Sequence, residues 1–214
     1  MTTGVLGSVA VGQVLANGFI KHGYEVMVGT SNKEKLSEWK INAGTNGKVG
    51  SFSEAAAFGD IAILAVKGTA AKDVLKIAGL ENIKNKTIID TTNPIADAPP
   101  ANGVLKFFTS LDKSLMEQLQ ADYPDANFVK AFNSIGNAFM VNPDFNGSKP
   151  TMFICGNNEN AKKEVSKILD KFGFEVEDMG KAEAARAIEP LCMLWCIPGF
   201  LRNQWSNAFK MLSK

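Results

Sequence analysis

The sequence has no disulfide framework and only one histidine. Its three cysteines, Cys155, Cys192 and Cys196, are odd in number and show no paired spacing, which excludes a disulfide-stapled secreted module and favours a reducing compartment. Cys192 and Cys196 lie four residues apart in an apolar stretch and form no CxxC motif, so we expect them to be buried. The histidine, His22, falls at the predicted end of a helix beside Gly23, where we expect a solvated position and no catalytic role. We predict no metal site.

The chain also lacks an excess of charge of either sign. Its 214 residues contain 23 Lys and Arg against 22 Asp and Glu, so no bulk field favours nucleic acid or an anionic membrane. The N-terminus has no basic segment followed by a long apolar core. The most apolar late stretch, residues 188–201, includes Glu189, Pro190 and Pro198 and is short of the roughly 20 residues that a membrane-spanning helix needs. These absences predict a cytoplasmic protein with no nucleic-acid or membrane partner.

What the sequence does contain is a repeated alternation of short apolar runs and helical patterns. Residues 60–66 and 87–90 are nearly continuous apolar runs, typical of strands buried on both faces of a parallel sheet. Ser53, with Glu54 directly after it, is expected to begin a further helical turn as its N-cap. The alternation predicts an α/β fold with a doubly wound, mainly parallel sheet. The predicted strands are residues 4–6, 25–28, 48–52, 60–66, 87–90, 127–132, 151–155 and 175–179, and the predicted helices are residues 12–22, 33–41, 69–79 and 160–172.

The first predicted strand runs into a glycine-containing turn, VLGSVAVGQVLA. Gly7 would permit the sharp turn after the strand, and Gly12 would permit close packing of the following helix on it. Val9 stands where such turns usually have a middle glycine, so it obstructs a dinucleotide by volume while leaving the backbone N–H donors in place. A strand–turn–helix without a ligand is the competing interpretation.

The end of the second predicted strand carries no carboxylate for a ribose diol. Residues 29–35, GTSNKEK, instead supply hydroxyls, an amide and two lysines, which suit the 2′-phosphate of NADP better than the free diol of NAD. An N-capped surface helix with solvated lysines is the alternative.

Several segments together carry a family resemblance. The stretch VLGSVAVGQVLANGFIKHGYEVMVGTSNKEK, followed by DIAILAVK, IIDTTNP, VKAFNSIG, MFICGNN, GFEVEDMG and EAARAIEPLCMLW, resembles the NADP-dependent oxidoreductases typified by NADPH:deazaflavin-coenzyme oxidoreductase. It is similar also to the cytoplasmic domain of six-transmembrane ferric reductases. The resemblance implies a Rossmann-type dinucleotide-binding domain over residues 1–150. Residues 151–214 would form a small C-terminal extension that completes the acceptor site and a homodimer interface.

The resemblance also implies roles for individual positions. Residues 8–11 would line the pyrophosphate turn, residues 30–35 would read the 2′-phosphate, residues 65–67 would pass the adenosine half, and Asn93 and Pro94 would edge the nicotinamide. Ala131, Phe132 and Asn133 would lie on the acceptor side. The expected cofactor-binding residues are Gly7, Ser8, Val9, Ala10, Val11, Gly12, Thr30, Ser31, Asn32, Lys35, Ala65, Val66, Lys67, Asn93 and Pro94. Ser31 replaces the arginine of the family's Ser-Arg pair, and Asn32, Lys33 and Lys35 could compensate.

No acid–base pair is evident in the sequence. Hydride transfer to a flavin- or deazaflavin-like ring does not require one, because solvent can supply the ring proton. We therefore expect an NADP-dependent oxidoreductase with such an acceptor, which residues 97–108, with Phe107 and Phe108, would cover. The alternatives are a dinucleotide-binding sensor or scaffold and a small imine or carbonyl reductase.

Arg186 and Glu189 lie three residues apart and are expected to form an ion pair; an anchor for the anionic tail of an acceptor is the second possibility. The apolar C-terminal stretch is expected to form a pocket wall and a dimer surface.

Overall fold

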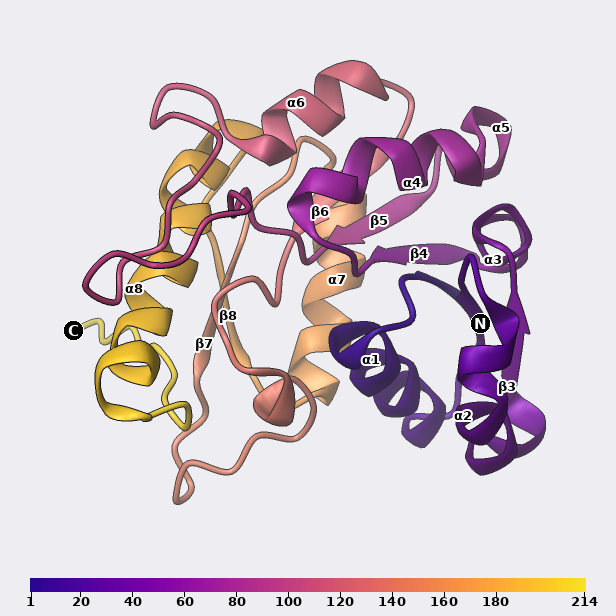
Figure 1. The fold of residues 1–214 in the computed structure, drawn as a ribbon, viewed down its shortest axis with the longest axis horizontal. Coiled ribbons are helices and arrows are strands. Elements are labelled where there is room, and N and C mark those ends of the chain that lie inside the picture. Colours follow the sequence, from indigo (N-terminus) through magenta and orange to yellow (C-terminus); the bar gives the residue numbers. More distant parts are fainter.

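A six-stranded parallel sheet forms the centre of the molecule (Figure 1). The computed structural model describes all residues, 1–214. The strand order is β3-β2-β1-β4-β5-β6, which is the order of a Rossmann-type doubly wound sheet and confirms the expected fold class. The six strands are β1 (Thr2–Leu6), β2 (Glu25–Gly29), β3 (Gly47–Gly50), β4 (Ile61–Leu64), β5 (Thr87–Asp90) and β6 (Asn127–Lys130).

Helices cover both faces of this sheet. In Figure 1, α4, α5 and α6 lie above the sheet, and α1 and α7 lie below it. The helices are α1 (Ala10–Lys21), α2 (Ser37–Asn42), α3 (Phe52–Phe58), α4 (Ala71–Ala78), α5 (Leu80–Ile83), α6 (Leu115–Asp122), α7 (Glu159–Lys171) and α8 (Ala185–Arg202). Short 3-10 turns span residues 33–36, 44–46, 68–70, 137–139 and 182–184.

The strand side chains alternate between two hydrophobic cores. In β4, Ile61 and Ile63 join the core that contains Leu15 and Phe19 of α1, whereas Ala62 and Leu64 join the core on the opposite face. This alternation is what the two-residue period of a strand produces when both faces are covered. The continuous apolar run of residues 60–66 is therefore explained by burial on both sides.

A second, two-stranded parallel sheet follows the main one. It pairs β7 (Thr151–Ile154) with β8 (Glu175–Asp178), and an antiparallel bridge between Lys130 and Cys155 connects it to β6. Met152 and Ile154 belong to the same buried cluster as the α1 side of the main sheet. Apolar packing thus crosses residue 150, and the proposed division into residues 1–150 and 151–214 stays a prediction.

Three local predictions around the third strand were wrong in detail. The strand ends at Gly50, because Ser51 and not Ser53 is the N-cap of α3. The Ser51 hydroxyl accepts the Glu54 N–H, and the Glu54 carboxylate accepts the Ser51 N–H, so the two form a capping box. The predicted helix over residues 33–41 begins as a 3-10 turn capped by Asn32 and becomes α2 only at Ser37.

The second half of the chain departs most from expectation. Helix α6 was not predicted, although Ser114 and Glu117 form a second capping box at its start. Helix α8 with its preceding turn covers residues 182–202, which is 21 residues and apolar enough in composition to cross a membrane, so the estimate that this stretch is too short was wrong. Core helices of folded domains have the same composition, and Ile188, Glu189 and Cys192 of α8 are buried against the rest of the chain.

Candidate functional site

A pocket opens at the carboxyl ends of β1, β4 and β5. Its volume is about 610 Å³, within the range typical of small-molecule sites. The carboxyl edge of a doubly wound sheet, where the strand order reverses between β1 and β4, is where such folds bind ligands. Its walls are the turn before α1, the β4–α4 connection and the chain that follows β5. The lining residues are Val9, Ala10, Val11, Ala65, Val66, Lys67, Gly68, Thr91, Thr92, Asn93, Ile95, Ala96, Asp97 and Ala98.

The two glycines of the first turn are required by close backbone contacts. Gly7 has φ +146°, and a Cβ there would lie 2.1 Å from the carbonyl oxygen of Ala65. A Cβ on Gly12 would lie 2.1 Å from the carbonyl oxygen of Gly7. The start of α1 therefore packs directly on the turn, and the turn packs directly on the end of β4. This is the arrangement that the glycine spacing predicted.

Val9 does not close the turn. It is the N-cap of α1 with φ −91°, a conformation open to any residue, and its side chain is 72% exposed at the edge of the pocket. No protein group accepts the N–H groups of Ala10 and Val11, which lie in the first turn of α1 beside the pocket. These donors and the positive end of the helix suit a pyrophosphate. The residues present therefore fit a dinucleotide.

The segment after β2 presents one free cation. The Ser8 hydroxyl donates to the Thr30 hydroxyl at 3.0 Å, and Thr30 itself is buried. Asn32 is occupied too, because its side chain accepts the N–H groups of Glu34 and Lys35. Ser31 and Lys35 are exposed and their side chains have no partner in the protein, so these two groups are available to a 2′-phosphate. Lys33, the other lysine here, is paired with Glu54 at 2.9 Å.

The pocket wall that follows β5 is held by hydrogen bonds directed into the protein. The Thr91 hydroxyl donates to the carbonyl oxygen of Leu64 at 2.9 Å, and the Thr92 hydroxyl donates to the Asp90 carboxylate at 2.7 Å. The Asn93 side-chain amide donates to the carbonyl oxygen of Asn133 at 2.8 Å. Neither hydroxyl is thus free to give a proton to a molecule in the pocket. The titratable lining residues are Lys67 and Asp97, a solvent-exposed pair 3.9 Å apart.

The comparisons with known proteins agree with this geometry. Residues 2–94 match the model of the family described as NADP oxidoreductase, coenzyme F420-dependent. The match covers less than half of the chain. A structure from Arthrobacter sp. FB24, provisionally described as an F420-dependent NADP reductase, is 27% identical, with a TM-score of 0.91 and coverage of 99% of both chains. Over residues 2–94 the chain is thus similar to NADP-dependent oxidoreductases.

Two other similar proteins are longer than this chain. The metalloreductase STEAP3 of Rattus norvegicus is 27% identical over 92% of the chain, which spans only 38% of the length of that relative. An imine reductase from Streptomyces aurantiacus shares the fold, with a TM-score of 0.68 at 14% identity, over 94% of this chain and 63% of its own.

The structure brings part of the expected cofactor site together in the pocket. The expected residues that line it are Val9, Ala10, Val11, Ala65, Val66, Lys67 and Asn93, and those outside it are Gly7, Ser8, Gly12, Thr30, Ser31, Asn32, Lys35 and Pro94. Gly7 and Gly12 do not line the pocket, but their close backbone contacts set the course of the turn that does. Pro94 is buried. The lining residues that were not expected are Gly68, Thr91, Thr92, Ile95, Ala96, Asp97 and Ala98. A signal for Thr91 and Thr92 was present, because they directly follow a buried strand.

The three residues expected on the acceptor side lie in a buried segment of the chain. Ala131, Phe132 and Asn133 are buried and do not line the pocket. Phe132 has φ +62°, a conformation that non-glycine residues rarely adopt, and its ring packs against Phe172 and Phe174 in the core. The bend at Phe132 turns the chain so that only the Asn133 main chain and amide reach the pocket residue Asn93.

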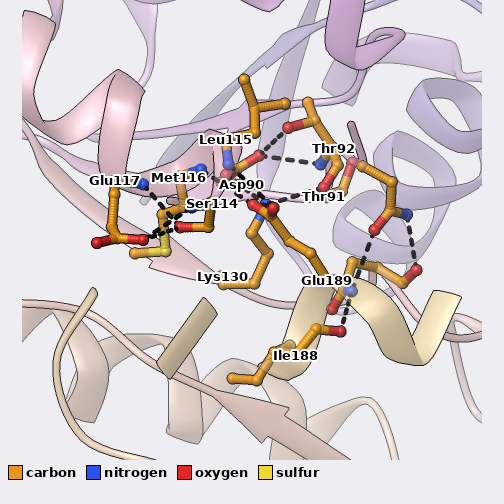
Figure 2. A network of polar contacts seen from close by, with 12 residues as sticks. Asp90, Thr91, Thr92, Ser114, Leu115, Met116, Glu117, Lys130, Ile188 and Glu189 are labelled. Atoms are coloured by element: carbon orange, nitrogen blue, oxygen red, sulfur yellow. Dashed lines mark hydrogen bonds and ion pairs between the residues drawn. The ribbon is translucent and has the colours of Figure 1, made fainter. Parts of the chain in front are cut away.

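A buried ionic cluster lies behind the pocket wall (Figure 2). Lys130 at the end of β6 contacts the carboxylates of Asp90 at 2.7 Å and Glu189 at 3.2 Å and donates to the carbonyl oxygen of Thr92 at 2.8 Å. Burial alone lowers the pKa of Lys130, but the two carboxylates together outweigh it and raise the pKa above its usual value. Lys130 is therefore charged.

The expected pairing of Arg186 with Glu189 was wrong. Arg186 pairs with Glu117 of α6 at 2.6 Å, and Glu189 turns inward, where its carboxylate accepts the N–H groups of Leu115 and Met116 at 2.9 Å each. The start of α6 offers Glu189 free N–H groups and a positive helix end, which a local spacing rule does not include.

Two further expectations can be compared with the structure. Cys192 and Cys196 are buried, as predicted, and burial together with the contact to Cys196 raises the pKa of the Cys192 thiol. His22 is half-buried, stacked on Phe172 and 3.3 Å from the Asn142 side chain, and lies away from the pocket.

Proposed function

We propose that the chain binds NADP(H) along the carboxyl edge of the sheet and passes hydride between its nicotinamide and a flavin- or deazaflavin-like ring. The single observation that carries the proposal is the pocket itself. It joins a glycine turn that fits a pyrophosphate to a wall whose two threonine hydroxyls both donate into the protein. The family match to coenzyme F420-dependent NADP oxidoreductases supports the same activity.

Each end of the cofactor has residues suited to it. The N–H groups of Ala10 and Val11 would hold the pyrophosphate, and Ser31 and Lys35 would hold the 2′-phosphate. The nicotinamide would lie against Asn93, and residues 65–67 would pass the adenosine half. When bound, the dinucleotide supplies the hydride.

The direction of the threonine hydroxyls favours one class of acceptor. Reduction of a carbonyl or imine needs a group that delivers a proton to the new hydroxyl or amine. Thr91 and Thr92 donate into the protein, and Lys67 and Asp97 are exposed. A flavin-like ring can take its proton from solvent, so the protein has only to align two rings and exclude water. Phe107 and Phe108, in the loop of residues 97–108, would cover that ring.

A titration of the purified protein with NADPH and with NADH, followed by nicotinamide fluorescence, tests the cofactor. We expect micromolar binding of NADPH and binding of NADH that is weaker by about tenfold, or roughly 1.4 kcal/mol. Anaerobic oxidation of bound NADPH is then followed with coenzyme F420, FMN, and a cyclic imine. Oxidation by a ring acceptor alone supports the proposal. Oxidation by the imine alone supports a reductase of carbon–nitrogen bonds, and binding without oxidation supports a sensor or scaffold.

We also propose that the chain works as a cytoplasmic homodimer. Large apolar side chains remain exposed on α8 and on the adjoining loop, whose Gly103 packs on Leu201 of α8. The exposed residues are Val104, Phe108, Leu111, Leu194, Phe200 and Leu201. A second copy that covered them would close the acceptor side of the pocket. Light scattering after gel filtration should give twice the 23.0 kDa chain mass, and Leu194→Glu should reduce it to that of the monomer.

A further inference from the structure

The buried cluster of Lys130, Asp90 and Glu189 is not explained by stability alone. Burying an ion costs several kcal/mol, and a buried ion pair is often no more stable than apolar residues of the same size. All three charged groups here are almost completely inaccessible, with side-chain exposures of 0%, 0% and 2%. A cluster of this kind fixes the relative positions of the groups that it contacts, because each buried charge has to keep all of its partners.

Lys130 uses all of its donors on three different parts of the fold. Its ammonium reaches the Asp90 carboxylate at the end of β5, the Glu189 carboxylate in α8 and the carbonyl oxygen of Thr92 in the pocket wall. The other oxygen of Asp90 accepts both the N–H and the hydroxyl of Thr92, at 2.9 and 2.7 Å. Thr92 is thus fixed by three hydrogen bonds to this cluster (Figure 2).

The next pocket residue is fixed to the same helix by a second route. The Asn133 amide donates to the side-chain oxygen of Asn93 at 3.2 Å and to the carbonyl oxygen of Ile188 at 2.9 Å, and its main-chain carbonyl accepts from Asn93 at 2.8 Å. Ile188 directly precedes Glu189 in α8. Two consecutive pocket residues, Thr92 and Asn93, are therefore connected to two consecutive residues of α8.

We propose that Lys130 is a positioning residue: with Asp90 and Glu189 it fixes Thr92 and Asn93 relative to α8, so that the nicotinamide edge of the pocket and α8 move as one body. The inference rests on the proposed function for its consequence, because that edge would face the ring that gives up hydride. It predicts that loss of the cluster harms the nicotinamide end and leaves the adenosine end, at Ser31 and Lys35, unchanged. Misplacement of a reacting group by about 1 Å can reduce a rate by about 100-fold.

Lys130→Met removes the ammonium at similar length, and Lys162→Met is its matched control. Lys162 is also buried, with 5% of its side chain exposed, and contacts two carboxylates, Glu159 at 2.9 Å and Asp178 at 2.8 Å. It contacts no pocket residue. Glu189→Gln serves if Lys130→Met does not fold, since the amide keeps the size of the side chain and one acceptor for the start of α6.

The first readout is amide hydrogen exchange of residues 91–93 in the protein without cofactor, with circular dichroism as the check of folding. We expect exchange to rise at least tenfold in Lys130→Met and Glu189→Gln and to stay within twofold of the wild type in Lys162→Met. Equal exchange in the wild type and in the folded cluster variants would overturn the inference, as would an equal rise in Lys162→Met. This readout stands even if the chain binds no nucleotide, so the two proposals fail separately.

The second readout compares adenosine 2′,5′-bisphosphate, which lacks the nicotinamide half, with NADPH. In Lys130→Met we expect the bisphosphate to bind within twofold of the wild type, NADPH to bind about tenfold more weakly, and the rate of hydride transfer to fall about 10- to 100-fold. A parallel loss of both affinities would mean that the cluster supports the fold as a whole, and the positioning role would be wrong.

Discussion

Replacement of Gly12 by alanine tests the turn on which the proposed cofactor site depends. The added Cβ would lie 2.1 Å from the Gly7 carbonyl oxygen and 2.7 Å from the Gly7 carbonyl carbon, where ordinary contact begins near 3.4 Å. Gly7 cannot retreat, because it is itself in close contact with the backbone of Ala65. The start of α1 must therefore move from the sheet by about 1 Å. Overpacking of this kind costs about 1–3 kcal/mol, or roughly 2–4 °C in Tm per kcal/mol for a chain of this size.

The same displacement moves the N–H groups of Ala10 and Val11 from the pyrophosphate position, so NADPH should bind at least about tenfold more weakly. Gly18→Ala is the control, since it places the same methyl group in the same helix but against the Val141 side chain, away from the pocket. It should lower the urea midpoint without changing the affinity for NADPH. If Gly12→Ala binds NADPH as tightly as the wild type, the close contact of Gly12 with Gly7 does not shape the site.

Three other substitutions test the adenosine end, the start of α1 and the contact between α6 and α8. Lys35→Ala should weaken NADPH binding by about 2- to 5-fold at low salt and leave NADH unchanged, because an exposed charge pair contributes up to about 1 kcal/mol; equal effects on both nucleotides would contradict this. Val9→Ser should add the side-chain cap that α1 lacks and raise the free energy of unfolding by about 1 kcal/mol, measured in urea. Glu117→Gln tests pH dependence. Burial would raise the pKa of Glu117, but hydrogen bonds from Arg186 and Ser114 lower it from 4.5 to about 2. The stability that this carboxylate contributes is present above pH 4.5 and is lost as the pH falls towards 2, so acid unfolding followed by circular dichroism should depend less on pH in the variant.

The sequence predicted the role of the two glycines in the pocket turn, but it did not predict the hydrogen-bond partners of the two threonines. Gly7 and Gly12 carry their geometric role in their spacing, because only glycine permits the two backbone contacts that the turn makes. Thr91 and Thr92 could be placed after a strand, but the direction of their hydroxyls depends on Leu64 and Asp90. Val9 illustrates the same limit, because only the tertiary structure shows that its side chain is exposed among the residues that line the pocket.

Local patterns determined the elements of this protein. Apolar runs, helical periods and the order of strands and helices were sufficient for a parallel Rossmann-type sheet, because burial on both faces and capping act over a few residues. Pairing between distant charges was decided only by the tertiary structure. Lys130 in the run NFVKAF and Glu189 in the helix AIEPL each look like polar residues in apolar surroundings, and Glu189 even has Arg186 at the right spacing for a surface pair. The fold brings Lys130 to Asp90, and α8 to the start of α6, so Glu189 gains two backbone donors and a buried cation. Such partners depend on which strands and helices are neighbours in the fold, and no short stretch of the sequence specifies these neighbours.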